Sequence, residues 1–160
     1  EGARLVAVLT QAQDPGNAGT IIRAADAAGA DAVVLVRGSV DPTAPKVVRS
    51  TAGSLFHLPV VTGVALDDAV TALHNAGLTV LAADGRGDFD LFEAESLLEA
   101  PSAWLLGNEA HGLPSEALSR ADAVVSIPIY GKAESLNVAA AAAVCLYASA
   151  RAQGQNSSRS

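Results

Sequence analysis

The segment IPIYGKAESLNVAAAAAVCLY, at residues 127–147, joins an apolar strand to an apolar helix through a polar loop. The hydrophobic pattern predicts a last strand at 124–129 and a last helix at 136–153, with Asn137 just inside the helix start. The first turn of a helix offers unpaired N–H groups and a favourable dipole to a ligand. We therefore expect the loop to hold a small molecule through its polar residues, which are Tyr130, Gly131, Lys132, Glu134 and Ser135.

Outward from this segment, strand-like and helix-like patterns alternate along the chain. Runs such as Val33-Val34-Leu35-Val36 are apolar on both faces, which is typical of parallel strands covered by helices on each side. The fold class predicted is therefore α/β, with a mostly parallel sheet and helices on both faces. The other predicted strands are 5–9, 32–36, 58–61, 78–82 and one that contains 104–106, and the other predicted helices are 16–29, 45–53, 66–75 and 114–120.

Composition narrows the class of protein. The chain has 160 residues, half of them hydrophobic and 17% charged, which indicates one globular domain. We find neither a signal peptide nor an apolar run near the roughly 20 residues of a membrane helix, so we expect a cytoplasmic protein without membrane contact. The single cysteine, Cys145, excludes an internal disulfide and a cysteine-based metal cluster, and packing in the core is its expected role. A net charge of -7 argues against a broad basic surface for nucleic acid.

Three groups of unusual residues each follow one of the predicted strands. In parallel α/β sheets, ligands bind beyond the carboxyl ends of the strands. In the first group, Asn17 is expected to cap the helix that follows, with function an equal alternative. Arg23 lies among small and apolar residues and offers a planar donor for a phosphate or carboxylate. A solvated surface arginine is the simpler alternative.

The second group is GNEAHGL at 107–113. Gly107 lets the backbone approach a ligand closely. Glu109 lies in a tight loop between two glycines, where function competes with a loop hydrogen bond. His111 is interpreted as an exposed loop residue.

The third group is the loop before the last helix. Ser135 lacks the glycine-flanked elbow of a serine nucleophile, so a helix cap is its simpler role, although both roles can coexist. The remaining signals are weaker. The stretch DGRG at 84–87 lacks the third glycine and the helix of a dinucleotide site. His57 and His74 are isolated in the sequence.

Taken together and in order, the three groups resemble the motifs of the SpoU (TrmH-like) family of RNA ribose 2′-O-methyltransferases, within the SPOUT superfamily. The resemblance rests on NAGTIIR at 17–23, on GNEAHGL at 107–113, and on IPI at 127–129 followed by SLNVA at 135–139. It covers nearly the whole chain.

The resemblance implies a deep trefoil knot near the C-terminus, a homodimer with the active site near the subunit interface, and S-adenosylmethionine as cofactor without a metal. The cofactor-binding residues that it implies are Ala82, Ala83, Gly85, Gly107, Asn108, Glu109, Ile127, Ile129, Ser135, Leu136 and Asn137. Among these, apolar residues would sandwich the adenine ring.

The family's catalytic positions correspond to Arg23, Asn17, Glu109, Ser135 and Asn137. A guanidinium is already protonated, since its pKa exceeds roughly 12, and so is a poor base. Arg23 is therefore expected to clamp a phosphate and the 2′-oxygen, while the proton passes to an RNA phosphate or to water. Asn17 would orient the ribose. Glu109, Ser135 and Asn137 would hold the loops and the nucleotide.

The expected substrate is ribosomal RNA. Transfer RNA is the alternative, and so is a module that binds S-adenosylmethionine or RNA without catalysis; an unrelated nucleotide-binding α/β enzyme is a further rival. Residues 1–153 are expected to form the catalytic domain and residues 154–160 a frayed tail. Because the chain is acidic and contains no methionine, we expect an N-terminal RNA-binding domain in a longer protein.

Overall fold

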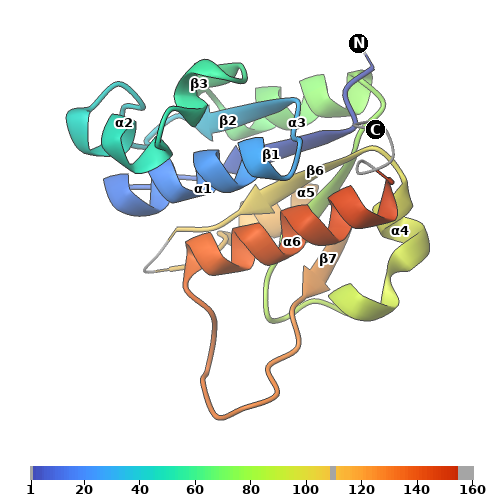
Figure 1. Ribbon diagram of the computed structural model, residues 1–160. Helices are drawn as coiled ribbons and strands as arrows, with labels where there is room; N and C mark the ends of the chain where they lie inside the picture. The colour runs from blue at the N-terminus through green and yellow to red at the C-terminus, as the bar shows by residue number, and fades with distance from the viewer. Residues whose placement is uncertain (1, 109–110, 155–160) are drawn as a thin grey trace.

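The fold is described from a computed structural model, for residues 2–108 and 111–154. Over these residues, seven parallel strands form one sheet in the order β3-β2-β1-β6-β4-β7-β5 (Figure 1). The parallel α/β class is thereby confirmed. The strands are β1 (Leu5–Leu9), β2 (Ala32–Val36), β3 (Val60–Val64), β4 (Thr79–Ala83), β5 (Phe89–Asp90), β6 (Ser102–Leu106) and β7 (Ala123–Ser126).

Helices cover both faces of the sheet. One face packs against α1 (Pro15–Ala27), α2 (Pro45–Thr51), α4 (Glu95–Glu99) and α6 (Val138–Ala152), and the other against α3 (Leu66–Asn75) and α5 (Ser115–Arg120). Strand β1 shows why the strands look apolar throughout. Its Leu5, Ala7 and Leu9 enter the first core, while Val6 and Val8 enter the second.

Three predicted strands have different bounds in the structure. The strand expected at 78–82 is β4, which starts and ends one residue later. The last strand, expected at 124–129, ends at Ser126. Pro128 has no N–H to donate to a ladder, and the chain leaves the sheet before it. The strand expected at 58–61 is β3, which starts at Val60 after Pro59 and forms the edge of the sheet.

The sequence patterns also missed some short elements. Strand β5 and helix α4 were not predicted, nor were the single 3₁₀ turns Ser54–Phe56 and Leu91–Glu93. Each spans five residues or fewer, too short to display a hydrophobic period.

Among the residues described, no helix has the length and apolar character needed to cross a membrane. The strand order does not test the trefoil knot, which stays a prediction.

Candidate functional site

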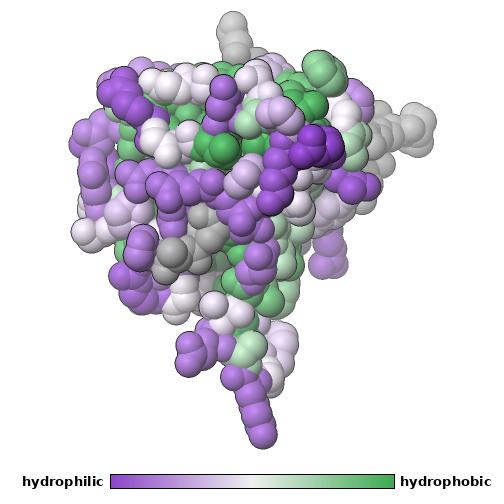
Figure 2. All heavy atoms as spheres, turned by 90° about the vertical axis from the view of Figure 1, so that its left-hand side faces the viewer, coloured by the Kyte–Doolittle hydropathy of each residue, from purple (hydrophilic) through white to green (hydrophobic). Residues whose placement is uncertain are grey.

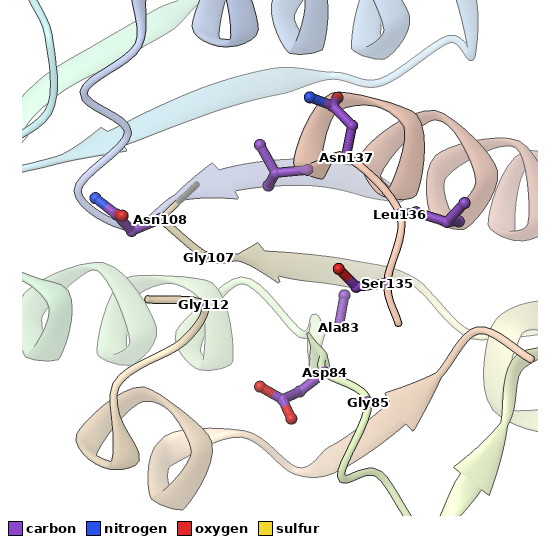
Figure 3. A pocket seen from close by; sticks show the side chains of 10 residues that line it. Ala83, Asp84, Gly85, Gly107, Asn108, Gly112, Ser135, Leu136 and Asn137 are labelled. Atoms are coloured by element: carbon purple, nitrogen blue, oxygen red, sulfur yellow. The ribbon is translucent and has the colours of Figure 1, made fainter. Parts of the chain in front are cut away.

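A cavity of about 450 Å³ opens where three neighbouring strands, β6, β4 and β7, reach their carboxyl ends. Figure 3 shows how the segments that follow these strands surround it. The turn after β4, the turn after β6 and the segment that enters α6 each line a different part of it. The lining residues are Ala83, Asp84, Gly85, Gly107, Asn108, Gly112, Ser135, Leu136, Asn137 and Val138.

A smaller lobe of about 100 Å³ adjoins this cavity and has a more apolar wall. It shares Ala83, Asp84, Gly85, Ser135 and Leu136 with the larger lobe, and it adds Ile127, Ile129 and Glu134. Ile127 and Ile129 lie beyond β7, so the early end of that strand turns their side chains toward the cavity. A pocket that joins an apolar slot to a polar chamber suits a ligand with a flat ring and a polar tail.

The start of α6 is held by Asn137. Asn137 was predicted inside the helix, but it is the N-cap: its Oδ1 accepts hydrogen bonds from the backbone N–H groups of Ala139 at 2.8 Å and Ala140 at 3.2 Å. An amide oxygen one residue before the first turn reaches these donors, whereas Ser135, the other candidate cap, lies two residues too early. Ser135 instead lines both lobes of the cavity.

Asn17 lies next to Asn137, although 120 residues separate them in the chain. The Nδ2 of Asn137 donates to the Oδ1 of Asn17 at 3.3 Å. The prediction that Asn17 caps its helix is wrong, because Asp14 is the N-cap of α1 and its Oδ1 accepts from the backbone N–H of Asn17 at 2.9 Å. Since Asp14 caps the helix, the side chain of Asn17 is left available to meet Asn137.

The turn after β6 depends on Gly107. A Cβ atom there would stand 2.5 Å from the backbone carbon of Gly112, so only glycine allows the turn to close this tightly. Asn108 and Gly112 exchange backbone hydrogen bonds of 3.1 and 2.9 Å across the turn. The Nδ2 of Asn108 also donates to the carbonyl of Gln11 at 2.9 Å, which ties this turn to the segment after β1.

Three predicted site residues, Asn17, Arg23 and Ala82, line neither lobe of the cavity. Arg23 is exposed on α1 and does not line the cavity; six residues beyond Asn17, it lies about 9 Å further along the helix and on another face. Ala82 is fully buried in β4 and lines neither lobe. Glu109 lies outside the described residues.

The sequence analysis missed Asp84. Asp84 lines both lobes, and its side chain is only 10% exposed. The stretch 84–87 was interpreted as an incomplete dinucleotide fingerprint, and only its Gly85 was among the expected cofactor-binding residues. The stronger signal was its place directly after a buried strand of a parallel sheet, where ligands bind.

The remaining titratable candidates have structural roles. His57 Nδ1 lies 2.7 Å from Asp26 Oδ2, and His74 Nε2 lies 2.9 Å from Asp122 Oδ2, so neither histidine is isolated. His111 is exposed, as predicted. Cys145 is fully buried in the core, also as predicted, and burial raises its pKa from 9.0 to about 12.

The comparison with protein families decides what kind of chain carries this site. Residues 4–147 match the sequence model of the SpoU rRNA Methylase family. The chain belongs to this family. The resemblance seen in the three motifs is thereby confirmed over nearly the whole chain.

Individual family members resemble the chain closely. The 23S rRNA (guanosine(2553)-2′-O)-methyltransferase RlmP of Bacillus subtilis is 43% identical over 148 residues, which are 91% of this chain and 57% of RlmP. Among solved structures, the SpoU methyltransferase AviRb of Streptomyces viridochromogenes in complex with AdoMet has a TM-score of 0.87 at 36% identity, over 97% of this chain and 63% of AviRb. The chain thus spans little more than half the length of such relatives.

One relative has about the same length as this chain. A structure described as giving insights into the 2-OH methylation of C/U34 on tRNA has a TM-score of 0.84 at 32% identity, and the match covers 96% of this chain and 98% of that one. The chain is therefore similar to proteins whose descriptions refer to ribosomal RNA and to one whose description refers to tRNA.

Proposed function

We propose that this chain is the catalytic domain of an S-adenosylmethionine-dependent methyltransferase that modifies a ribose 2′-hydroxyl in ribosomal RNA. The observation that carries the proposal is the two-lobed cavity at the ends of β6, β4 and β7. Family membership and the similarity to RlmP support the reaction and the RNA class. Residues 1–153 are proposed as the catalytic unit, and an RNA-binding domain before them stays a prediction.

The cavity fits the proposed cofactor in shape and chemistry. The small lobe has Ile127, Ile129 and Leu136 in its wall and would take the adenine ring. The larger lobe exposes backbone at Gly85 and Gly107 and would take the polar remainder of the molecule. When bound, S-adenosylmethionine supplies an electrophilic methyl group, so the chemistry needs no metal.

The protein's own groups would position the RNA. Asn17 and Asn137 form a hydrogen-bonded pair between the cavity and α1, where an amide can orient a ribose. Arg23 would hold an RNA phosphate beside the target ribose, because its guanidinium binds phosphate through two parallel hydrogen bonds. Since arginine stays protonated, the 2′-proton would leave to a phosphate or to water.

We also propose a cytoplasmic homodimer whose interface includes α6. Although one face of α6 enters the core, Tyr147 on another face is 53% exposed. In Figure 2 the segment between β7 and α6 projects from the body of the molecule, with hydrophilic residues at its tip. This segment also exposes Ile129, Tyr130 and Leu136, which supports its burial against a second subunit. Because Arg23 lies outside the cavity wall, a dimer could also place it beside the partner's site.

The test is methyl transfer from labelled S-adenosylmethionine to 23S ribosomal RNA and to transfer RNA, with the modified nucleotide mapped. We expect the label on a ribose of ribosomal RNA. Arg23→Ala should reduce kcat/KM by about a hundredfold, since a lost clamp on a charged group removes roughly 3 kcal/mol, and Arg23→Lys should restore part of it. Methyl groups found on a base would contradict the proposed reaction.

Transfer RNA is the second candidate substrate. It is favoured by the similarity to the structure connected with tRNA methylation, which matches this chain over nearly its full length. Efficient transfer to transfer RNA, with none to ribosomal RNA, would replace the first substrate by the second.

A further inference from the structure

Asp84, which lines both lobes of the cavity, forms an ion pair with Arg86. The Nε of Arg86 donates to Asp84 Oδ1 at 2.7 Å, and one of its Nη atoms donates to Asp84 Oδ2 at 2.8 Å. The same Nη atom donates to the backbone carbonyl of Leu113 at 3.3 Å. One guanidinium therefore binds the segment after β4 and the turn after β6 together.

These two segments are the walls of the crevice in which the cavity lies. The ladder between β4 and β6 ends at the pair Ala82 and Leu105, just before the cavity begins. Asp84 continues one wall, and Figure 3 shows its carboxylate pointing toward the segment that carries Gly112 in the other wall. A Cβ atom on Gly112 would stand 4.0 Å from Asp84 Oδ2, so the walls are close where Arg86 joins them.

Arg86 also favours the ionised form of Asp84. Its hydrogen bonds lower the pKa of Asp84 against the opposite effect of partial burial, so Asp84 stays ionised at neutral pH. Arg86 itself is 65% exposed, and ion pairs of exposed arginines add little to the stability of a fold. The pair is therefore better placed to fix local geometry than to stabilise the whole protein.

We propose that Asp84 and Arg86 act as a clamp that holds the two walls of the cofactor cavity at the separation that the ligand needs. Both are positioning residues, and neither takes part in the reaction itself. The inference rests on the proposed function, because the ligand in question is S-adenosylmethionine. A cavity whose walls are held before the ligand arrives binds more tightly, since less order must be created on binding.

The binding test uses calorimetry with S-adenosylhomocysteine as the probe. Arg86→Ala should raise its Kd about tenfold, as expected when a charge-assisted link is lost. Asp84→Ala should have a similar effect, and the double variant should bind within about twofold of either single variant because the two residues act as one unit. The matched control is Arg120→Ala, which removes the pair between Arg120 Nη2 of α5 and Asp67 Oδ2 of α3, 2.9 Å apart, neither of which lines the cavity. It should leave Kd unchanged.

A second measurement needs no ligand. In the free protein, Arg86→Ala should speed amide hydrogen exchange in peptides that contain Gly107, Gly112 and Leu113, whereas Arg120→Ala should not. Arg86→Lys keeps the charge but cannot bind both carboxylate oxygens in a planar fork, so its effects should be intermediate. With saturating S-adenosylmethionine, kcat of Arg86→Ala should stay within about twofold of wild type while KM rises, as expected when binding alone is weakened.

The possible outcomes distinguish a failure of the clamp from a failure of the proposed function. A wild-type protein that binds neither S-adenosylmethionine nor its product would overturn the proposed function. If the wild type binds the probe and the Arg86 and Asp84 variants bind it equally well, with unchanged exchange, the clamp is refuted and the proposed function stands. Should Arg86→Ala fail to fold, Arg86→Lys and Asp84→Asn provide the same comparison.

Discussion

Asn137 performs two tasks with the two ends of one side-chain amide. Its oxygen accepts from the N–H groups of Ala139 and Ala140, and its nitrogen donates to Asn17. The first task begins α6, and the second joins α6 to α1 at the edge of the cavity. Substitutions can separate the two tasks because aspartate and asparagine are equally good N-caps, while only asparagine has the donor.

We expect Asn137→Ala to lower the free energy of unfolding by about 1 kcal/mol through the lost cap, and Asn137→Asp to stay within about 0.5 kcal/mol of wild type. Both should reduce methyl transfer by about tenfold, because both lose the bond to Asn17. Urea unfolding and single-turnover kinetics measure the two effects. Full activity in Asn137→Asp would show that the contact with Asn17 is dispensable.

Cys145 should make the folded protein less stable as the pH rises above neutral. Burial raises its pKa to about 12 in the folded protein, against 9.0 for a free thiol, so between these values only the unfolded chain releases the proton. Stability from this group is therefore complete below pH 9.0 and is lost as the pH rises toward about 12. From about pH 8 to about pH 10 the free energy of unfolding should fall by about 1.4 kcal/mol more than in Cys145→Ala, which has no thiol to titrate. Equal pH slopes in the two proteins would contradict this.

At the scale of elements, the contact between α1 and α2 depends on Gly19. A Cβ atom on Gly19 would collide with the Cβ of Ser50 and would stand 2.8 Å from the carbonyl oxygen of Val47. Since backbone of α2 blocks the position, the two helices must separate to accept any larger residue. This close approach also explains why the first motif contains a glycine in the middle of a helix.

Gly19→Ala should therefore lower the free energy of unfolding by about 1–3 kcal/mol, despite the better helix propensity of alanine. Gly16→Ala is the matched control within α1, because the nearest atoms to its Cβ belong to the side chains of Asp14 and Lys46. It should cost less stability than Gly19→Ala, because the Asp14 side-chain oxygen, 3.2 Å from that Cβ, can shift whereas the backbone of α2 cannot. Thermal unfolding of both variants and of wild type measures these differences in stability. A Gly19→Ala protein as stable as wild type would exclude the proposed steric obstruction between α1 and α2.

At the scale of the whole molecule, the exposed face of α6 predicts self-association. Sedimentation equilibrium should give about twice the monomer mass of 16.0 kDa. A stable interface of standard size would cover about 800 Å² of each subunit. Tyr147→Glu should shift the mass toward the monomer, because it places a charge in the proposed interface. Val61→Glu, at an exposed position on the edge strand β3, is the control and should remain dimeric. A monomeric wild type would rule out the homodimer.

Local patterns were sufficient for most of the architecture. The bounds of β1, β2 and α3 were predicted to the residue, because runs buried on both faces and an amphipathic helix leave clear periodic signals. The three motifs also identified the family, and the second and third contain residues that line the cavity. Those conclusions depend only on neighbouring residues or on motif order along the chain.

The meeting of distant side chains could not be predicted in this way. The cap at Asp14 frees Asn17 to meet Asn137, and Arg86 reaches across a crevice to Leu113; both contacts depend on where separate strands end. Arg23 has the right chemistry for the site but lies on another face of α1, which follows from the rotation of the packed helix. The sequence therefore determined the sheet, the family and the type of ligand chemistry, whereas tertiary packing decided which polar groups face one another, because such contacts join residues that no local pattern connects.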